Sequence, residues 1–246
     1  LNLLKNHNLS KTTMIKLVDI LTEGVYDPGI FKAVFTAGGP GSGKSYAAST
    51  LFGMPEKMPF VSAAGLKGVN TDSAFKTFLN KAGLNTDLAS MNPEQFAQSQ
   101  EIRDRAKKTV AAQMKNYING KLGVLIDGTG HKYDKIANKK RTLEGLGYDC
   151  FMVFVNTSLE VALERNEARE RTLPVNLVKE YWSSCQNNLG KFQGLFGAGN
   201  MLVVDNSEYK DFAKNVKKGA NEFIRRPIQN RVAKDWIKKE LQIRKG

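Results

Sequence analysis

The chain has 246 residues, of which 41% are hydrophobic and 25% charged, enough to bury one core of an ordinary α/β domain. Its 37 lysines and arginines exceed its 24 aspartates and glutamates, giving a formal net charge of +13. No apolar run approaches the length of a membrane span, and residues 1–13 lack the apolar core of a signal peptide. These features exclude a membrane protein and predict a cytoplasmic one.

The two cysteines indicate the redox compartment of the protein, and the surplus of positive charge indicates the kind of partner it binds. Cys150 and Cys185 each stand alone, which argues against a zinc site or a disulfide framework and indicates a reducing compartment. A small anion needs only a few of the extra cations. The surplus therefore indicates a larger anionic partner, with nucleic acid the first candidate, or else a solvated, solubilising surface. Composition leaves both interpretations and the oligomeric state open.

The first segment, residues 1–30, is expected to be an N-terminal extension. Apolar residues from Ile15 to Leu21 recur at helical spacing and predict a short helix, which Gly24 and Asp27-Pro28-Gly29 end. The main domain is expected over residues 31–206, and its first strand is the apolar run Ala33 to Ala37.

A glycine-rich motif follows this strand and precedes a helix predicted over residues 44–52. It fits G-x-x-x-x-G-K-[ST] and consists of Gly38, Gly39, Pro40, Gly41, Ser42, Gly43, Lys44 and Ser45. Glycines allow the backbone N–H groups to approach a polyphosphate, Lys44 reaches its β- and γ-phosphates, and Ser45 offers a hydroxyl to Mg²⁺. The motif predicts an ATP and Mg²⁺ site, and the alternative is a glycine-rich turn that ends in Lys-Ser by chance.

Asp72 ends the next short apolar stretch, which begins at Gly68 and weakly predicts a second strand. A carboxylate at the carboxyl end of a parallel strand faces the ligand crevice and can accept a proton from an attacking hydroxyl. The alternative is that Asp72 only caps a helix predicted over residues 73–82, and spacing alone does not separate the two.

A second acid follows the third strand. Asn92, Pro93 and Gly120 bound a long helix, and Leu122 to Asp127 is an apolar strand that ends in a carboxylate. Asp127 is expected to hold Mg²⁺ opposite Ser45. Because Asp-Gly is also a turn signal, the alternative is a plain strand-end turn.

Arginines follow the fourth strand. A helix over residues 132–146 leads to an apolar strand over residues 148–155, and Asn156 to Ser158 begins a helix that runs into Arg165, Arg169 and Arg171. Arg165 and Arg169 are four residues apart, so we expect them on one helical face. The alternative is ion pairing with the neighbouring glutamates 164, 167 and 170, as on any exposed helix.

The remaining chain is predicted as a helix over residues 174–189, a glycine-rich connection over 190–200, a fifth strand over 201–205, and helices over 208–224 and 229–243. Residues 207–246 form a separate basic helical segment, with eight basic residues from Arg225 onward. We expect this segment to be docked on the domain or partly mobile, and contact with nucleic acid is the alternative.

Strands that alternate with helices, a phosphate loop and arginines before the fifth strand resemble the P-loop kinases, and more closely the zeta-toxin and polynucleotide-kinase group. The resemblance covers about residues 31–206. From residues alone the fold is a doubly wound α/β domain. The resemblance implies a five-stranded parallel sheet of order 2-3-1-4-5 with helices on both faces.

Three segments besides the loop carry this resemblance. Asn70-Thr71-Asp72 looks like the motif whose aspartate is the general base, and Val124 to Thr129 resembles the segment with the third-strand acid. Arg165 to Arg169, followed by Pro174-Val175, is similar to the lid of phage-type polynucleotide 5′-kinases. The resemblance implies that Arg165 and Arg169 grip the transferring phosphate, with Arg171 as a third candidate.

The chain also departs from both groups. The 5′-kinases place an arginine three residues after the base, where this chain has Phe75, and zeta toxins place an aromatic and a basic residue in this region, as Phe75-Lys76 does with one residue inserted. The expected acceptor is a 5′-hydroxyl of nucleic acid or a nucleotide, and the alternative is a nucleotide sugar. A third reading is a nucleotide-gated nucleic-acid-binding module without phosphotransfer.

Overall fold

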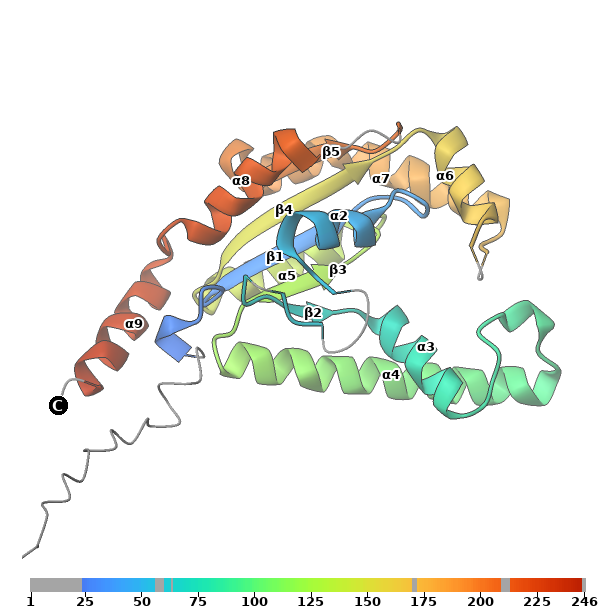
Figure 1. Ribbon diagram of the computed structural model, residues 1–246, viewed down its shortest axis with the longest axis horizontal. Helices are drawn as coiled ribbons and strands as arrows, with labels where there is room; N and C mark the ends of the chain where they lie inside the picture. The colour runs from blue at the N-terminus through green and yellow to red at the C-terminus, as the bar shows by residue number, and fades with distance from the viewer. Residues whose placement is uncertain (1–23, 56–59, 63, 170–171, 209–212, 245–246) are drawn as a thin grey trace, which may run out of the picture.

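The computed structural model describes residues 24–55, 60–62, 64–169, 172–208 and 213–244. Its centre is a parallel sheet of five strands in the order β2-β3-β1-β4-β5 (Figure 1). The strands are β1 (Lys32–Ala37), β2 (Lys67–Val69), β3 (Val124–Asp127), β4 (Asp149–Asn156) and β5 (Met201–Asp205). Both the doubly wound α/β class and the expected strand order are confirmed. The helix expected near Ile15 lies outside the described residues.

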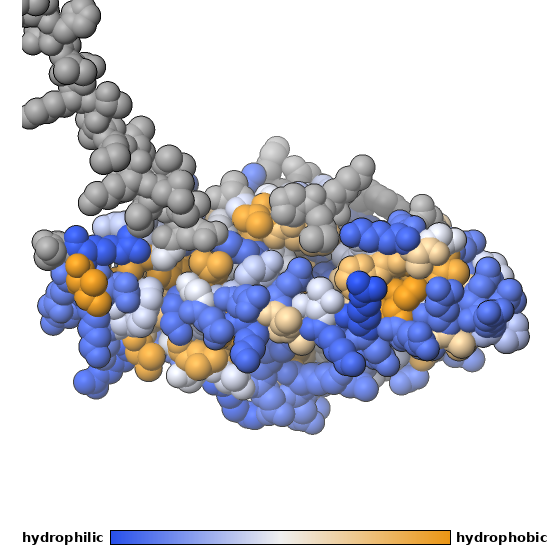
Figure 2. All heavy atoms as spheres, turned by 90° about the horizontal axis from the view of Figure 1, so that it is seen from below, coloured by the Kyte–Doolittle hydropathy of each residue, from blue (hydrophilic) through white to orange (hydrophobic). Residues whose placement is uncertain are grey.

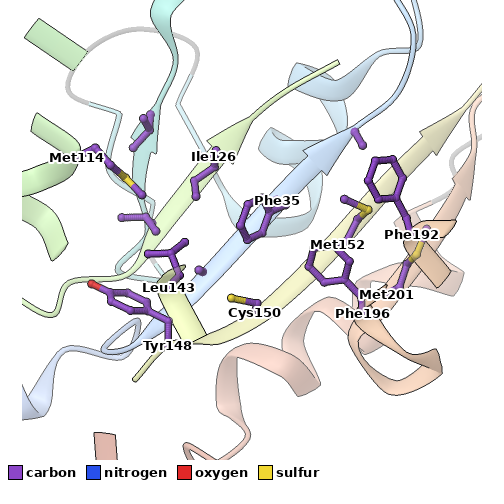
Figure 3. Close-up of a cluster of buried hydrophobic side chains, with 14 of the residues drawn as sticks. Phe35, Met114, Ile126, Leu143, Tyr148, Cys150, Met152, Phe192, Phe196 and Met201 are labelled. Carbon is purple, nitrogen blue, oxygen red and sulfur yellow. The ribbon is translucent and has the colours of Figure 1, made fainter. Parts of the chain in front are cut away.

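Helices cover both faces of the sheet, because successive side chains of each strand point to opposite faces. On one face Phe35, Ile126 and Met152 pack with residues of α4 (Pro93–Asn119), α5 (Tyr133–Gly145), α7 (Val175–Phe196) and α9 (Arg231–Ile243) (Figure 3). On the other face Val34 and Val153 pack with α2 (Lys44–Phe52) and α8 (Ala213–Arg225). The alternation explains why the strands read as continuous apolar runs.

Two helices extend away from the sheet beyond β2. α3 (Thr71–Lys81) packs against α4, and the pair forms an arm with a small core of its own, built from Phe75, Leu79 and Ala106 (Figure 1). α4 begins and ends where the sequence predicts, because Asn92 and Gln95 form a capping box and Pro93 occupies the first position. The short 3-10 turns are η1 (Gly24–Tyr26), η2 (Leu88–Ser90) and η3 (Ala198–Asn200).

The predicted end of α7 is wrong. The helix continues through Gly190 and Gly194 to Phe196, where the sequence predicts a glycine-rich connection. Each internal glycine costs about 1 kcal/mol relative to alanine. Burying a phenylalanine side chain stabilises by about 1.5–3 kcal/mol, and both Phe192 and Phe196 are buried against the sheet. Tertiary packing therefore outweighs the local preference.

α9 lies at the end of the sheet where the strands begin, away from α6 (Leu159–Glu167) (Figure 1). The carboxylate of Asp149 accepts from the backbone N–H groups of Gln229 and Asn230 at 2.9 and 3.0 Å, and Lys32 Nζ lies 3.4 Å from it. Trp236 of α9 packs edge-on against Phe31. These contacts dock the C-terminal helices firmly on the sheet.

The described surface is largely polar. The face seen from below in Figure 2, on the side of α4 and α9, is mostly hydrophilic, with hydrophobic residues in smaller separate groups. Within the described ranges, none of the helices combines the length and the hydropathy that crossing a membrane requires.

Candidate functional site

The phosphate loop connects β1 to α2 in the backbone conformation that its glycines permit. Gly41 and Gly43 have φ angles of +77° and +87°, which residues other than glycine rarely adopt. Gly43 is the N-cap of α2 and brings no side chain to cap it. The free N–H groups of the first turn and the positive end of the helix dipole therefore remain available to an anion.

Lys44 occupies the first position of α2 and points back over the loop. Its Nζ donates to the backbone oxygens of Gly38 and Gly39 at 2.8 and 3.1 Å. Burial lowers the pKa of Lys44, while the nearby carboxylate of Asp127 and the thiol of Cys185 act in the opposite direction. Arg169 adds to the lowering and Asp72 opposes it, more weakly. Lys44 is therefore within electrostatic range of Asp127, Arg169 and Asp72.

Asp127 ends β3 beside Thr36 of β1, to which it is paired in register. Its Oδ1 accepts from Thr36 Oγ1 at 2.7 Å, and its Oδ2 accepts from Asn70 Nδ2 at 2.8 Å. Two neutral donors from the neighbouring strands thus orient the carboxylate without neutralising it. The sequence did not predict that Thr36 and Asn70 donate to Asp127. The only available signal was that both are polar residues at strand ends.

Asp72 lies in the first turn of α3 and is exposed. The helix begins at Thr71, and its cap is Asn70, whose Oδ1 accepts from Ser73 N at 3.1 Å. The interpretation of Asp72 as the N-cap of a helix over residues 73–82 is therefore wrong. Its carboxylate stays available at the carboxyl edge of the sheet.

The arginines fall on different structural elements. Arg165 lies in the last turn of α6 and its Nη1 is 3.4 Å from the oxygen of Gly41, so it contacts the phosphate loop directly. α6 ends at Glu167, so Arg169 lies beyond the helix and the prediction of a shared helical face is wrong. Arg169 nevertheless acts on Lys44, as described above. Arg171 lies outside the described residues.

Asn166 holds the two sides of the arginine segment together. It is buried, its Nδ2 donates to the oxygen of Leu173 at 2.9 Å, and its Oδ1 accepts from Leu173 N at 3.0 Å. This two-point contact joins the end of α6 to the residues before α7. The sequence did not predict this contact, because an asparagine between two charged residues is typical of an exposed position.

α7 donates side-chain hydrogen bonds to the loops at the carboxyl edge of the sheet. Trp182 Nε1 donates to Thr157 O at 2.8 Å and Cys185 Sγ to Thr129 O at 2.8 Å. The Nδ2 of buried Asn188 donates to the oxygens of Gly130 and His131 at 3.0 and 3.2 Å. Since Thr129 O also accepts from Gly38 N at 3.1 Å, α7 is linked through this loop to the phosphate loop.

The loop after β5 braces the phosphate loop from the other side. Asn206 is buried, and its Nδ2 donates to Ser42 O at 2.8 Å. A Cβ at Gly43 would collide with this amide, which is a second reason for glycine there. The sequence analysis missed Asn206, which no local motif marks.

His131 and Tyr181 form a further polar pair near this edge. Their rings stack with centroids 4.4 Å apart, and His131 Nδ1 contacts the hydroxyl of Thr129. Burial lowers the pKa of His131, and the neighbouring Lys132 and Lys135 lower it further. These effects favour the neutral imidazole, while Glu180 acts in the opposite direction on the pKa.

Comparison with known proteins agrees with this arrangement. The model of the AAA_33 family, described as an AAA domain, matches residues 34–190. A search of curated protein sequences found no significant match. The solved complex of AvrRxo1-ORF1 and ORF2 with ATP is similar in fold, with a TM-score of 0.51 and 14% identity over 73% of this chain and 56% of that chain.

Two other structures have lower TM-scores. They are the Pnkp1/Rnl/Hen1 RNA repair complex (0.47, 19% identity, 65% of this chain and 46% of that chain) and the PezAT toxin-antitoxin system of Streptococcus pneumoniae (0.48, 13% identity, 78% and 84%). The chain spans about half the length of the first solved structures it matches. The family match covers more than half of the chain, and the sheet order is that of the P-loop kinases. The chain belongs to the AAA_33 family, and it has the fold and the nucleotide-binding loop of a P-loop kinase.

Proposed function

We propose that this protein is an ATP- and Mg²⁺-dependent kinase that transfers a γ-phosphoryl group to a hydroxyl, with a 5′-hydroxyl of nucleic acid or of a nucleotide as the acceptor. The observation that carries the proposal is the geometry at the phosphate loop, where Lys44 Nζ lies 2.8 Å from Gly38 O and Arg165 Nη1 lies 3.4 Å from Gly41 O. Lys44 follows β1 and Arg165 lies in α6, so two separate parts of the chain supply positive charge to the loop.

Each group has a distinct role in the proposed reaction. The loop N–H groups and Lys44 bind the β- and γ-phosphates, and Arg165 and Arg169 offset negative charge on the transferred group, with Arg171 as a third candidate. Asp72 accepts the proton as the acceptor oxygen bonds to the γ-phosphorus, and the bond from that phosphorus to the β-phosphate oxygen breaks. The products are ADP and a phosphate monoester.

The donor set near Lys44 fits Mg²⁺. Asp127 contributes a carboxylate in which each oxygen accepts one hydrogen bond, from Thr36 or Asn70, and keeps further lone pairs. Ser45 is exposed on the first turn of α2 and contributes a hydroxyl. Hard oxygen ligands of this kind suit Mg²⁺, which in kinases also binds the phosphates of the substrate. When bound, the ion offsets charge on the β- and γ-phosphates.

The acceptor side favours nucleic acid over a nucleotide sugar. Phe75, the candidate for the aromatic contact of zeta toxins, is 1% exposed and packs in the core of the arm. Its ring therefore serves folding and is not exposed to a ligand. The formal charge of +13 and the lid-like arginine segment support a polyanionic acceptor.

Incubation with γ-labelled ATP and Mg²⁺ tests the proposal, using separate pools of 5′-hydroxyl oligonucleotides, nucleosides and nucleotide sugars. We expect label on the oligonucleotides, acceptor-dependent release of ADP, and no transfer by Lys44→Ala. Retention of a tenth of wild-type turnover by that variant would remove the site assignment. Label on the sugar pool alone would assign the zeta-toxin-like activity. Binding of ATP without transfer to any pool would leave the nucleotide-gated binding module.

A further inference from the structure

More than half of the net positive charge lies in the C-terminal segment that contains α8 and α9. Residues 213–244 contain ten lysines and arginines and three acidic residues, a net of +7 out of +13 for the whole chain. The nucleotide site uses none of these residues. Their concentration on α8 and α9 therefore requires a separate explanation.

Most of the cations on α8 and α9 have no carboxylate partner. Among the described residues of these two helices, five exposed cations have no carboxylate within ion-pair distance: Lys217, Arg225, Lys234, Lys238 and Lys239. The pairs that do form, Lys218–Glu222 at 3.9 Å and Arg231–Asp235 at 4.0 Å, are long and solvated. Such exposed pairs contribute little and dissociate readily.

On α4, by contrast, local partners engage several cations. Lys107 Nζ lies 2.8 Å from Asp104 Oδ1. The guanidinium groups of Arg103 and Arg105 lie over the rings of Phe75 and Phe78. α4 is thus a basic helix in which three of five cations are engaged within its own arm, and it serves as a reference in the same molecule.

The surface of α8 and α9 is also concave at two places. One hollow of about 650 Å³ is lined by Lys218, Asn221, Glu222, Arg225 and Arg226. A second hollow of about 580 Å³ has the apolar residues Ile228, Ile237 and Leu241 beside Lys234 and Lys238. The cations that line the hollows can hold successive phosphates of a strand. We call Lys218, Arg225, Lys234, Lys238 and these two hollows the α8–α9 surface.

We propose that the α8–α9 surface binds single-stranded nucleic acid. A strand with one negative charge per nucleotide matches a series of uncompensated cations that runs over two helices, whereas a protein surface of mixed charge does not. A flat membrane leaves the floors of the hollows unused. The anchor at Asp149 keeps the surface fixed relative to the sheet, so that a strand bound there is held by the same rigid body that carries the phosphate loop.

This inference rests on the proposed function, because it gives the nucleic-acid acceptor a second binding surface on the protein. Its test, however, requires no phosphotransfer. Truncation before α9 is unsuitable, because Ala233 and Trp236 belong to the packed core. The test therefore uses the full chain with the quadruple variant Lys218→Gln, Arg225→Gln, Lys234→Gln and Lys238→Gln. The matched control is Arg105→Gln, Lys107→Gln, Lys108→Gln and Lys115→Gln on α4, which removes the same charge from exposed positions.

The measurement is fluorescence anisotropy of a labelled 30-nucleotide oligothymidylate over a range of KCl concentrations, with circular dichroism to verify folding. Each phosphate contact adds about 0.7 to the slope of log K against log salt, so four lost contacts flatten the slope by roughly three units. We expect this for the α8–α9 variant and a change below about one unit for the α4 variant.

Equal flattening in both variants would reduce the effect to net charge and overturn the proposal, as would no flattening in either. Polyglutamate of equal charge that competes as well as the oligonucleotide would assign the surface to acidic proteins instead. Binding to phosphatidylserine vesicles in the absence of oligonucleotide binding would assign it to membranes. Phosphotransfer measured separately shows whether the kinase proposal fails, since binding can persist without it.

Discussion

Asn70 links two residues of the candidate site through one side chain. Its Nδ2 donates to Asp127 Oδ2 at 2.8 Å, and its Oδ1 accepts from Ser73 N at 3.1 Å, which caps the helix that carries Asp72. The proposed metal ligand and the proposed base are therefore positioned by the same amide. Either half of the contact can be removed without the other.

Asn70→Asp is expected to retain the cap and lose the donor, because aspartate caps helices as well as asparagine does. A second carboxylate then faces Asp127, and two like charges at this distance raise the pKa of one of them. We expect kcat to fall by roughly 10- to 100-fold, as for other residues that hydrogen-bond to metal ligands. We also expect the acidic limb of the pH profile of kcat to move to higher pH. The pH profile and the melting temperature measure the two effects. Asn70→Ser keeps a cap without the added charge, so an equal pH shift in both variants would contradict the explanation.

Asp72→Asn is expected to lower kcat by roughly 10² to 10⁴ with little change in ATP affinity, because an amide cannot accept the proton. Asp72 is not the cap, so the only structural loss is its interaction with the helix dipole, about 0.3–1 kcal/mol. Glu94→Gln removes a first-turn carboxylate from α4 in the same way and is the matched control. If both variants keep wild-type kcat and lose the same stability, Asp72 is not the base.

Asn188→Asp tests whether α7 positions the loop after β3. The substitution preserves the shape but places an anion against the oxygens of Gly130 and His131. We expect a destabilised protein whose remaining folded fraction has a raised KM for ATP, because that loop contacts Gly38. Asn187→Asp adds the same charge at the neighbouring exposed position and is expected to change neither value. A melting-temperature loss with an unchanged KM for ATP would limit Asn188 to a structural role.

Asp149→Ala is expected to destabilise the protein by about 3–5 kcal/mol, because it leaves Lys32 buried without its carboxylate partner and frees two N–H groups before α9. Urea unfolding measures the loss. Asp235→Ala, which removes an exposed carboxylate of α9, is the control and should cost less than about 1 kcal/mol. Similar losses in both variants would show that Asp149 is not the anchor.

The loss of stability caused by Asp149→Ala is also expected to depend on pH. Burial lowers the pKa of Lys32 below 10.5 while Asp149 raises it, so the unfolded chain binds more protons than the folded one just below pH 10.5. Stability from this group therefore rises with pH in that window. Removing Asp149 lowers the folded pKa further, so the loss caused by Asp149→Ala should shrink as pH rises toward 10.5. A loss that is constant from pH 7 to 10 would contradict the role of Lys32.

Both thiols are expected to resist modification in the folded protein. Burial raises the pKa of Cys185 to about 11, with the charge of Lys44 acting against it, and burial also raises the pKa of Cys150. At pH 8 the thiolate fraction of Cys185 is then roughly 10⁻³. Ellman's reagent should detect neither thiol at pH 8 until denaturant is added, and the reactivity of Cys185 should increase as pH rises toward 11. One rapidly reacting thiol in the native protein at pH 8 would contradict the described burial.

The sequence by itself determined the elements that depend on consecutive residues. The apolar runs predict the five strands, but the second, expected to run from Gly68 to Asp72, ends at Val69, and Asp72 lies in α3. Asn92, Pro93 and Gly120 bound α4, and the glycines before Lys44 specify the loop and the helix after it. Turn and cap chemistry is local, because a side chain that satisfies a nearby backbone group needs no distant partner. The same reasoning placed Lys44, Asp127 and Asp72 at strand or helix ends without showing that they meet.

Only the tertiary structure decided which distant residues hold these side chains in place, and where packing overrides local secondary-structure preferences. Thr36 and Asn70 reach Asp127 across strand pairings that join parts of the chain far apart in sequence, and Asn206 reaches Ser42 from beyond β5. α7 continues through Gly190 because Phe192 and Phe196 are buried against strands that precede it by dozens of residues. A hydrogen bond or a buried ring depends on distance in space, which composition and periodicity do not encode, so these contacts could only be found in the folded chain.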